Sequence, residues 1–185
     1  HVARHDGLGL ESFEPDGGIQ QPRLHPDGRG VCIRDDTGWL NLWLDEAPLV
    51  DEPYEHAGPS WGPGQRSFAV SPTGSHVAFA RNEGGFGRLC VVEVETGAVT
   101  ELARAVHGGL DWRGDRLVAL RTGGRTPTQV VVCDTTDLAA TTRHTLAVGP
   151  SLNWDDEPAL VEPELIEAVA EDGATVFARL YRCPE

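Results

Sequence analysis

The sequence predicts an all-β fold, a partial β-propeller of about three to four four-stranded blades. A turn motif that ends in Gly recurs at separations of 46 and 40 residues, and β-branched segments follow it. No segment before residue 155 has a sustained apolar period of 3.6 residues, so amphipathic helices are not expected. A content of 22 Gly and 13 Pro suits short strands joined by many turns.

The recurring motif reads H-P-D-G, S-P-T-G and D-W-R-G, and it ends at Gly28, Gly74 and Gly114. Hairpin turns often need a positive φ, which glycine adopts at little cost, so glycine at these positions has a physical reason. The separations match the roughly 40 residues of a propeller blade. A two-sheet sandwich would have similar strands without this fixed period.

The strands of each unit are placed from its motif onward. One strand follows the motif, a Gly-rich turn comes next, and a second strand rich in β-branched residues suits a half-buried pleated surface. The first strands are expected at 29–34, 75–81 and 115–121, and the second strands at 39–44, 88–94 and 129–134.

The C-terminal segment follows a different pattern. Residues 163–169 alternate in polarity, an E-D-G turn follows at 171–173, and a second alternating strand ends at Pro184. This hairpin fits no blade by period. We therefore expect blades over 1–160 and, over 161–185, a hairpin that leads to a further domain.

The chain is expected to be part of a longer polypeptide. It contains no Met, so we expect that His1 is not a translational start. About 160 residues at roughly 40 per blade give at most four blades, and a ring that does not close leaves strand edges exposed. An incomplete ring cut from a larger one is the simpler interpretation.

Composition and charge argue against two classes of partner. Nucleic-acid binding needs clustered Lys or Arg, whereas this chain has a net charge of −14. No apolar run approaches the about 18 residues of a membrane span, so no membrane partner is expected. No secretory signal is visible, and a cytoplasmic location is expected.

No metal ion or cofactor is expected. The seven histidines form neither H-x-H nor H-E-x-x-H, and the D-D-E run at 155–157 lacks the ligand spacing of a Ca²⁺ loop. No C-x-x-C pair occurs, and reduced cysteines in apolar strands behave as small buried hydrophobes. The four cysteines are Cys32, Cys90, Cys133 and Cys183.

Two further features are expected to be structural. The G-G-F-G run at 84–87 is flanked by strands, so it predicts a hairpin turn rather than a phosphate-binding loop. Four tryptophans lie at or beside the expected strands and are expected to pack within blades. They are Trp39, Trp43, Trp112 and Trp154.

The segment G-P-S-W-G at 58–62 matches the G-x-S-x-G pattern of a nucleophile elbow. An elbow places its Ser between a strand and a helix. Here Pro59 precedes Ser60, and the G-P-G run at 62–64 prevents a helix from starting at once. Ser60 is therefore not expected to be a nucleophile, and no catalytic residue is predicted in this chain.

The same segment is expected to form a loop near the mouth or channel of the propeller. Its charged and aromatic side chains could contact a substrate there. The candidate substrate-binding residues are Glu55, Trp61 and Arg66, and packing or solvation of the same side chains is the alternative.

Three stretches carry a resemblance to a known family. They are the blade pattern from S-P-T-G to A-V-T-E-L at 71–102, the run E-H-A-G-P-S-W-G at 55–62, and the segment from P-E-L-I to R-C-P at 163–184. Together they resemble the propeller of the prolyl oligopeptidase family of serine peptidases, in its acylaminoacyl-peptidase or dipeptidyl-peptidase-like bacterial branch. The resemblance covers nearly the whole chain.

This resemblance implies a function. In that family an α/β-hydrolase domain carries a Ser–Asp–His triad, and the propeller caps the active site and filters peptides by size. The resemblance therefore implies a peptidase parent, a peptide substrate and a non-catalytic fragment whose hydrolase domain lies beyond Glu185. Two alternatives stay open: a stand-alone binding propeller of TolB or WD-repeat type, and a propeller hydrolase with a central metal.

Overall fold

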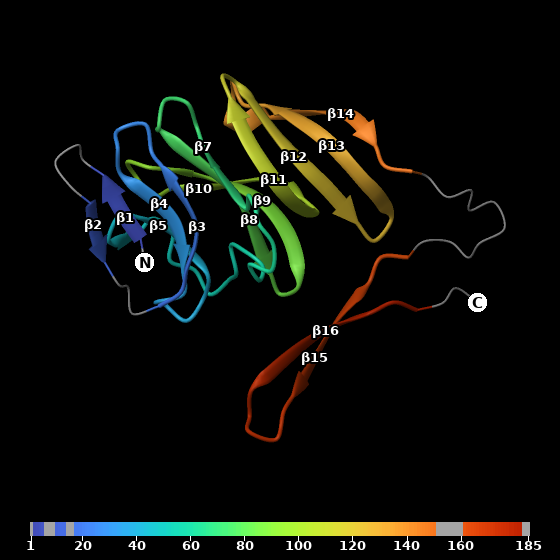
Figure 1. The fold of residues 1–185 in the computed structure, drawn as a ribbon. Helices are drawn as coiled ribbons and strands as arrows, with labels where there is room; N and C mark the ends of the chain where they lie inside the picture. Colours follow the sequence, from blue (N-terminus) through green and yellow to red (C-terminus); the bar gives the residue numbers. More distant parts are fainter. Residues whose placement is uncertain (1, 6–9, 14–16, 151–160, 183–185) are drawn as a thin grey trace.

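The computed structural model describes residues 2–5, 10–13, 17–150 and 161–182. Within these ranges the chain forms three four-stranded sheets and two two-stranded hairpins (Figure 1). All pairings in these sheets are antiparallel. The predicted all-β fold, a partial propeller of four-stranded blades, is confirmed.

The three sheets are called blades 1, 2 and 3 in chain order. Blade 1 contains β3 (Ile19–Leu24), β4 (Gly30–Arg34), β5 (Asn41–Leu44) and β6 (Ala47–Pro48). Blade 2 contains β7 (Phe68–Val70), β8 (His76–Glu83), β9 (Phe86–Glu93) and β10 (Val99–Arg104). Blade 3 contains β11 (Val106–Arg113), β12 (Arg116–Gly123), β13 (Thr126–Asp134) and β14 (Thr142–Val148).

Three shorter elements complete the described chain. A 3-10 helix, η1 (Leu138–Ala140), lies between β13 and β14. One hairpin precedes blade 1 and is formed by β1 (Val2–His5) and β2 (Leu10–Phe13). The other follows blade 3 and is formed by β15 (Glu164–Val169) and β16 (Thr175–Leu180). It is the predicted C-terminal hairpin, and we call it the exit hairpin.

Strands pair in sequence order within each blade, so short turns join neighbouring strands. The three motif glycines occupy such turns with positive φ, as predicted: 91° at Gly28, 75° at Gly74 and 52° at Gly114. The hairpin turn predicted at 84–87 is present between β8 and β9, but it is shorter, with residues 84–85 in the turn and Phe86 at the start of β9. The Gly markers in the sequence therefore report real left-handed turn positions.

Blade 2 is buried on both faces. Val77 and Phe79 of β8 pack toward blade 1, whereas Ala78 packs toward blade 3, because successive side chains of a strand point to opposite faces. A sheet buried on both faces needs apolar residues at consecutive positions. This explains the unbroken apolar run of β9, where Leu89 and Val91 face blade 3 and Cys90 and Val92 face blade 1.

The two connections between blades differ greatly in length. Residues 49–67 join β6 to β7, whereas Ala105 alone joins β10 to β11. Strand β11 packs against β7, β8 and β9, which seats blade 3 beside blade 2. The first strands of the three blades thus lie along neighbouring edges.

The predictions for cysteine and tryptophan are confirmed at most positions that the structure describes. Cys32, Cys90 and Cys133 are buried free thiols, and Cys183 lies outside the described residues. Trp43 and Trp112 are buried, and the Arg34 guanidinium stacks over the Trp43 ring at 4.3 Å.

The prediction for Trp39 is wrong, because this side chain is 41% exposed. It occupies the turn between β4 and β5, outside the strands whose side chains form the core between blades 1 and 2. Trp154 and the acidic run at 155–157 lie outside the described residues.

The turns between strands lie at two opposite ends of each blade, and these ends define two faces of the molecule, which we call the exit face and the marker face. The exit face carries the β8–β9 and β12–β13 turns and the exit hairpin (Figure 1). Arg179 of the hairpin lies beside Gly85 of the first turn, and residues 161–163, just before the hairpin, lie beside Gly124 of the second turn. The loop at 57–66 also lies there, because it leads directly into the start of β7, opposite Ala80 of β8. The marker face is the opposite side, with the three motif glycines.

Candidate functional site

The loop at 57–66 is compact and presents one large apolar side chain. The Pro59 carbonyl accepts hydrogen bonds from the Trp61 amide at 3.0 Å and from Gln65 Nε2 at 2.8 Å. Trp61 is nevertheless 92% exposed. The loop is followed by β7 and not by a helix, so the surroundings of Ser60 lack the strand–Ser–helix arrangement of an elbow.

The Glu55 side chain braces the loop from inside the fold. Its Oε2 accepts a hydrogen bond from the Leu40 amide at 2.8 Å, and its carbonyl accepts one from the Asn82 amide at 2.8 Å. Glu55 therefore joins blade 1 to the end of β8. Its carboxylate already has a partner within the chain.

The Arg66 side chain joins blade 2 to blade 3. Its Nη1 donates to Asp111 Oδ1 at 3.0 Å, and its carbonyl accepts from the Leu110 amide at 3.0 Å. The three predicted site residues thus share one connecting segment but point to different partners. Of these three, only Trp61 presents its side chain wholly to solvent.

A buried polar network lies next to this segment, and sequence reasoning missed it. His56 is fully buried, and its Nδ1 accepts from the Leu42 amide at 3.2 Å. Because Nδ1 is the acceptor, Nε2 carries the proton and donates to Glu52 Oε2 at 3.2 Å. Arg81 Nη1 donates to both Glu52 oxygens, at 3.1 and 3.2 Å.

The electrostatics of this network follow from its partners. The hydrogen bond from His56, together with the charge of Arg81, lowers the pKa of the Glu52 carboxyl, although burial acts in the opposite direction. A sequence signal existed, because Arg81 lies in phase with the buried Val77 and Phe79 of β8. A charged residue at an inward position indicates a buried partner.

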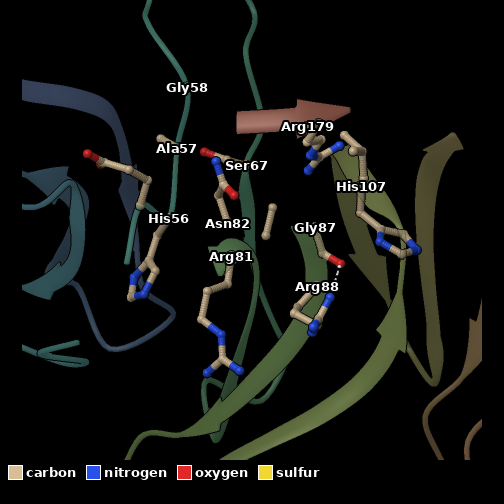
Figure 2. A pocket seen from close by; sticks show the side chains of 13 residues that line it. His56, Ala57, Gly58, Ser67, Arg81, Asn82, Gly87, Arg88, His107 and Arg179 are labelled. Atoms are coloured by element: carbon tan, nitrogen blue, oxygen red, sulfur yellow. Dashed lines mark hydrogen bonds between the residues drawn. The ribbon is translucent and has the colours of Figure 1, made fainter. Parts of the chain in front are cut away.

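A cavity of about 210 Å³ opens on the exit face between blades 2 and 3. Blade residues, the 55–58 segment and the exit hairpin all contribute to it (Figure 2). Arg179 of β16 lies over the cavity, and the side chains of His56 and Arg81 extend away from Arg179 (Figure 2). The Arg179 guanidinium stacks over the Phe86 ring at 4.7 Å, which holds the hairpin against the β8–β9 turn.

His107 of β11 also borders this cavity and is buried. Its Nδ1 donates to the Ala105 carbonyl at 2.9 Å, and its Nε2 has no partner within the described residues. Burial, with the nearby charges of Arg121 and Arg143, lowers the pKa of His107 to about 4. The imidazole is therefore neutral at pH 7.

The described residues contain neither a metal-binding cluster nor a membrane-spanning helix. No group of three or more His, Cys, Asp or Glu side chains in the described part of the chain is arranged to hold a metal ion. Across the same part of the chain, no helix has the length and apolar character needed to cross a membrane.

Among known proteins, this chain is similar to proteins of solved structure. No protein-family model matches the sequence, and no curated protein matches it. Puromycin hydrolase is 27% identical, with a TM-score of 0.74 over 90% of this chain and 26% of that chain. A puromycin-hydrolyzing peptidase of Mycobacterium tuberculosis is 23% identical, with a TM-score of 0.76 over 95% of this chain and 28% of that chain.

Two further likenesses are of the fold alone. TolB from Acinetobacter baumannii is 15% identical, with a TM-score of 0.58 over 96% of this chain and 41% of that chain. A prolyl endopeptidase is 14% identical, with a TM-score of 0.56 over 91% of this chain and 24% of that chain. The predicted resemblance to the propeller region of prolyl oligopeptidase-family peptidases is confirmed, and the chain spans about a quarter of the peptidases it matches.

Proposed function

We propose that this chain is the propeller portion next to the hydrolase domain of a serine peptidase of the prolyl oligopeptidase family. In this role it is non-catalytic, caps the active site and admits peptides by size. The observation that carries the proposal is the exit hairpin, which follows blade 3 and packs on the β8–β9 turn through Arg179. A closed binding propeller has no use for such a hairpin. The 27% identity to puromycin hydrolase supports the same assignment.

A size filter must be rigid, and contacts between the first strands of the blades supply rigidity. Gln21 of β3 holds Ser67 ahead of β7, accepting from its amide at 2.8 Å and donating to its hydroxyl at 2.6 Å. The pair of Arg66 with Asp111 makes the next link, to β11. Links of this kind between blades support the fixed width that the proposed size filter needs.

The predicted site residues take different roles in this proposal. Glu55 and Arg66 fix the two ends of the loop, because both side chains are engaged within the chain. Trp61 is the residue proposed to meet the peptide or the hydrolase domain, since a rigid, exposed indole on the exit face contributes a large contact area.

The test uses the full-length parent protein and the 185-residue chain side by side. The parent is expected to hydrolyse aminoacyl amide reporters, whereas the 185-residue chain is expected to be inactive. Trp61→Ala in the parent is expected to lower kcat/KM for peptides by about tenfold, as loss of a buried aromatic contact does. Ser60→Ala is the matched control in the same loop and is expected to leave activity unchanged.

Turnover by the 185-residue chain that disappears in Ser60→Ala would overturn the proposal. The second candidate is a stand-alone binding propeller, which the likeness to TolB favours at the level of fold. The gene distinguishes the two. A G-x-S-x-G elbow between strand and helix downstream of Glu185, followed by Asp and His, identifies the peptidase, and a stop codon near Glu185 identifies the binding propeller.

A further inference from the structure

We propose that the cavity beneath Arg179 binds a small apolar group that carries a carboxylate, with Arg179 as its ion-pair partner. The interpretation of this ligand as the C-terminal residue of a peptide rests on the proposed function. The binding site itself depends only on the cavity and on the charges around it.

The cavity has the size and lining for one small apolar side chain. Its volume of about 210 Å³ lies below the roughly 300–1,000 Å³ of pockets for drug-sized ligands. Ala57, Ala80 and Val106 supply apolar wall from three separate elements. An aliphatic group that enters this space exchanges water for these walls, which favours binding.

Arg179 is the cation available to a ligand in this cavity. It makes no ion pair with any described residue, in a chain with a net charge of −14. The two other arginines that line the cavity are engaged. Arg81 pairs with Glu52 at 3.1 Å, and Arg88 lies 3.3 Å from Glu101.

The carboxylate that borders the cavity, that of Glu55, makes no ion pair with Arg179 among the described residues, and its Oε2 accepts a hydrogen bond from the Leu40 amide on the side of blade 1. Asn82 lines the same space and offers an amide to the peptide group of a ligand. The arrangement therefore suits an acid with a short apolar side chain. A neutral ligand of the same shape lacks the partner that Arg179 needs.

The position of Arg179 depends on the β8–β9 turn. A Cβ atom added at Gly85 would lie 3.3 Å from Arg179 Nε, and Gly85 has a φ of 86°, which other residues rarely adopt. Phe86, the next residue, supplies the ring that holds the guanidinium. This turn therefore sets the position of the cation over the cavity.

The experiment compares two ligands of nearly the same shape, N-acetyl-L-leucine with a carboxylate and N-acetyl-L-leucinamide with a neutral carboxamide. Titration into the 185-residue chain is followed by amide chemical shifts of Ala80, Asn82 and Val106. The acid is expected to bind at least about tenfold more tightly than the amide, the size of a charge-assisted hydrogen bond. Arg179→Gln is expected to remove that difference and leave binding of the amide unchanged.

Two variants keep the test decisive. Arg182→Gln removes an arginine of the same segment that pairs with Glu164, and it is expected to change neither affinity. Ala80→Leu fills the cavity and is expected to weaken both ligands. Equal affinities for acid and amide, no binding of either, or an unaltered preference in Arg179→Gln would overturn the proposal.

The outcome is independent of the peptidase assignment. Preferential binding of the acid by a chain whose parent hydrolyses no peptide would keep the site and reject the proposed function. A parent with peptidase activity whose propeller shows no such preference would do the reverse.

Discussion

The junction of blades 1 and 2 and the junction of blades 2 and 3 both have an apolar core, but the polar contacts at their ends differ. At the marker face, His25 of blade 1 reaches Gly74 of blade 2, with its Nε2 2.7 Å from the Gly74 carbonyl. The equivalent residue of the next unit is Ser71, which bonds locally to Thr73. A groove of about 700 Å³ remains at the junction of blades 2 and 3, lined by Ser71 and Trp112 among others.

Near the exit face, too, the polar residues of the first junction are paired and, among the described residues, those of the second are not. Between blades 1 and 2, Arg81 and His56 share the carboxylate of Glu52, so charges are paired. Between blades 2 and 3, His107 lies near Arg121, and Arg121 makes no ion pair with any described residue. Apolar side chains of the strands therefore form the core of both junctions, whereas a few polar residues at the ends of a junction close it or leave it open.

The largest expected effect tests the sealed junction. Phe79 is the largest fully buried side chain among the described residues, and Phe79→Ala is expected to lower the free energy of unfolding by about 3–5 kcal/mol. Urea unfolding measures the loss. Hydrogen exchange should show lower protection of Ile33 and Leu42 than of Leu117, because the cavity opens toward blade 1. Uniform loss across all three blades would show that the junctions do not open separately.

The second prediction separates the junctions by pH. The pKa of His107 is about 4 in the fold against 6.5 when unfolded, so the unfolded chain takes up a proton first as pH falls. Stability from this group is complete above about pH 6.5 and is lost progressively toward pH 4, by about 3 kcal/mol. His107→Gln should flatten this window in urea unfolding at pH 7, 5.5 and 4.5.

Glu52 at the other junction serves as the internal reference. Its pKa is lowered, so its contribution is present above about pH 4.5 and is lost only as the pH falls further. Acid should therefore weaken the junction of blades 2 and 3 before the junction of blades 1 and 2. The reverse order in hydrogen exchange would contradict this assignment of charges.

The smallest expected effects come from exchanging the marker-face residues. His25→Ser removes a buried hydrogen bond and its packing, and it is expected to cost about 1–2 kcal/mol. Ser71→His is expected to gain about 0.5–1 kcal/mol by filling the groove of blades 2 and 3. Thermal unfolding of both variants measures the exchange. A loss in Ser71→His would show that the groove is too wide for an imidazole to close.

Much of the fold was predictable because it is periodic. Gly28, Gly74 and Gly114 marked turns with positive φ, and segments rich in β-branched residues marked strands between them. The exit hairpin lies outside that period and was predictable from its two alternating strands and the E-D-G turn between them. Trp39 was not, because a tryptophan beside a strand packs only where a neighbouring blade covers it.

The site was less predictable, because it depends on contacts between units distant in sequence. Nothing in the E-H-A-G-P-S-W-G run shows that Glu55 meets Leu40 or that Arg66 meets Asp111. The cavity needs Arg179, more than 90 residues from Gly85, and no local pattern joins them. One feature of the sequence did point to the buried network, because Arg81 lies on the same face of β8 as the buried Phe79.

The unequal connections between blades have a consequence for how the chain can be cut. Ala105 alone links β10 to β11, so a protease could cut there only after the ends of both strands had separated from their partners. The loop at 57–66 contains no strand residues, and residues 58–64 are exposed. A protease should therefore nick the protein first beside Trp61 and leave blades 2 and 3 as one piece. The same loop is the place at which the protein could be split into two complementing halves.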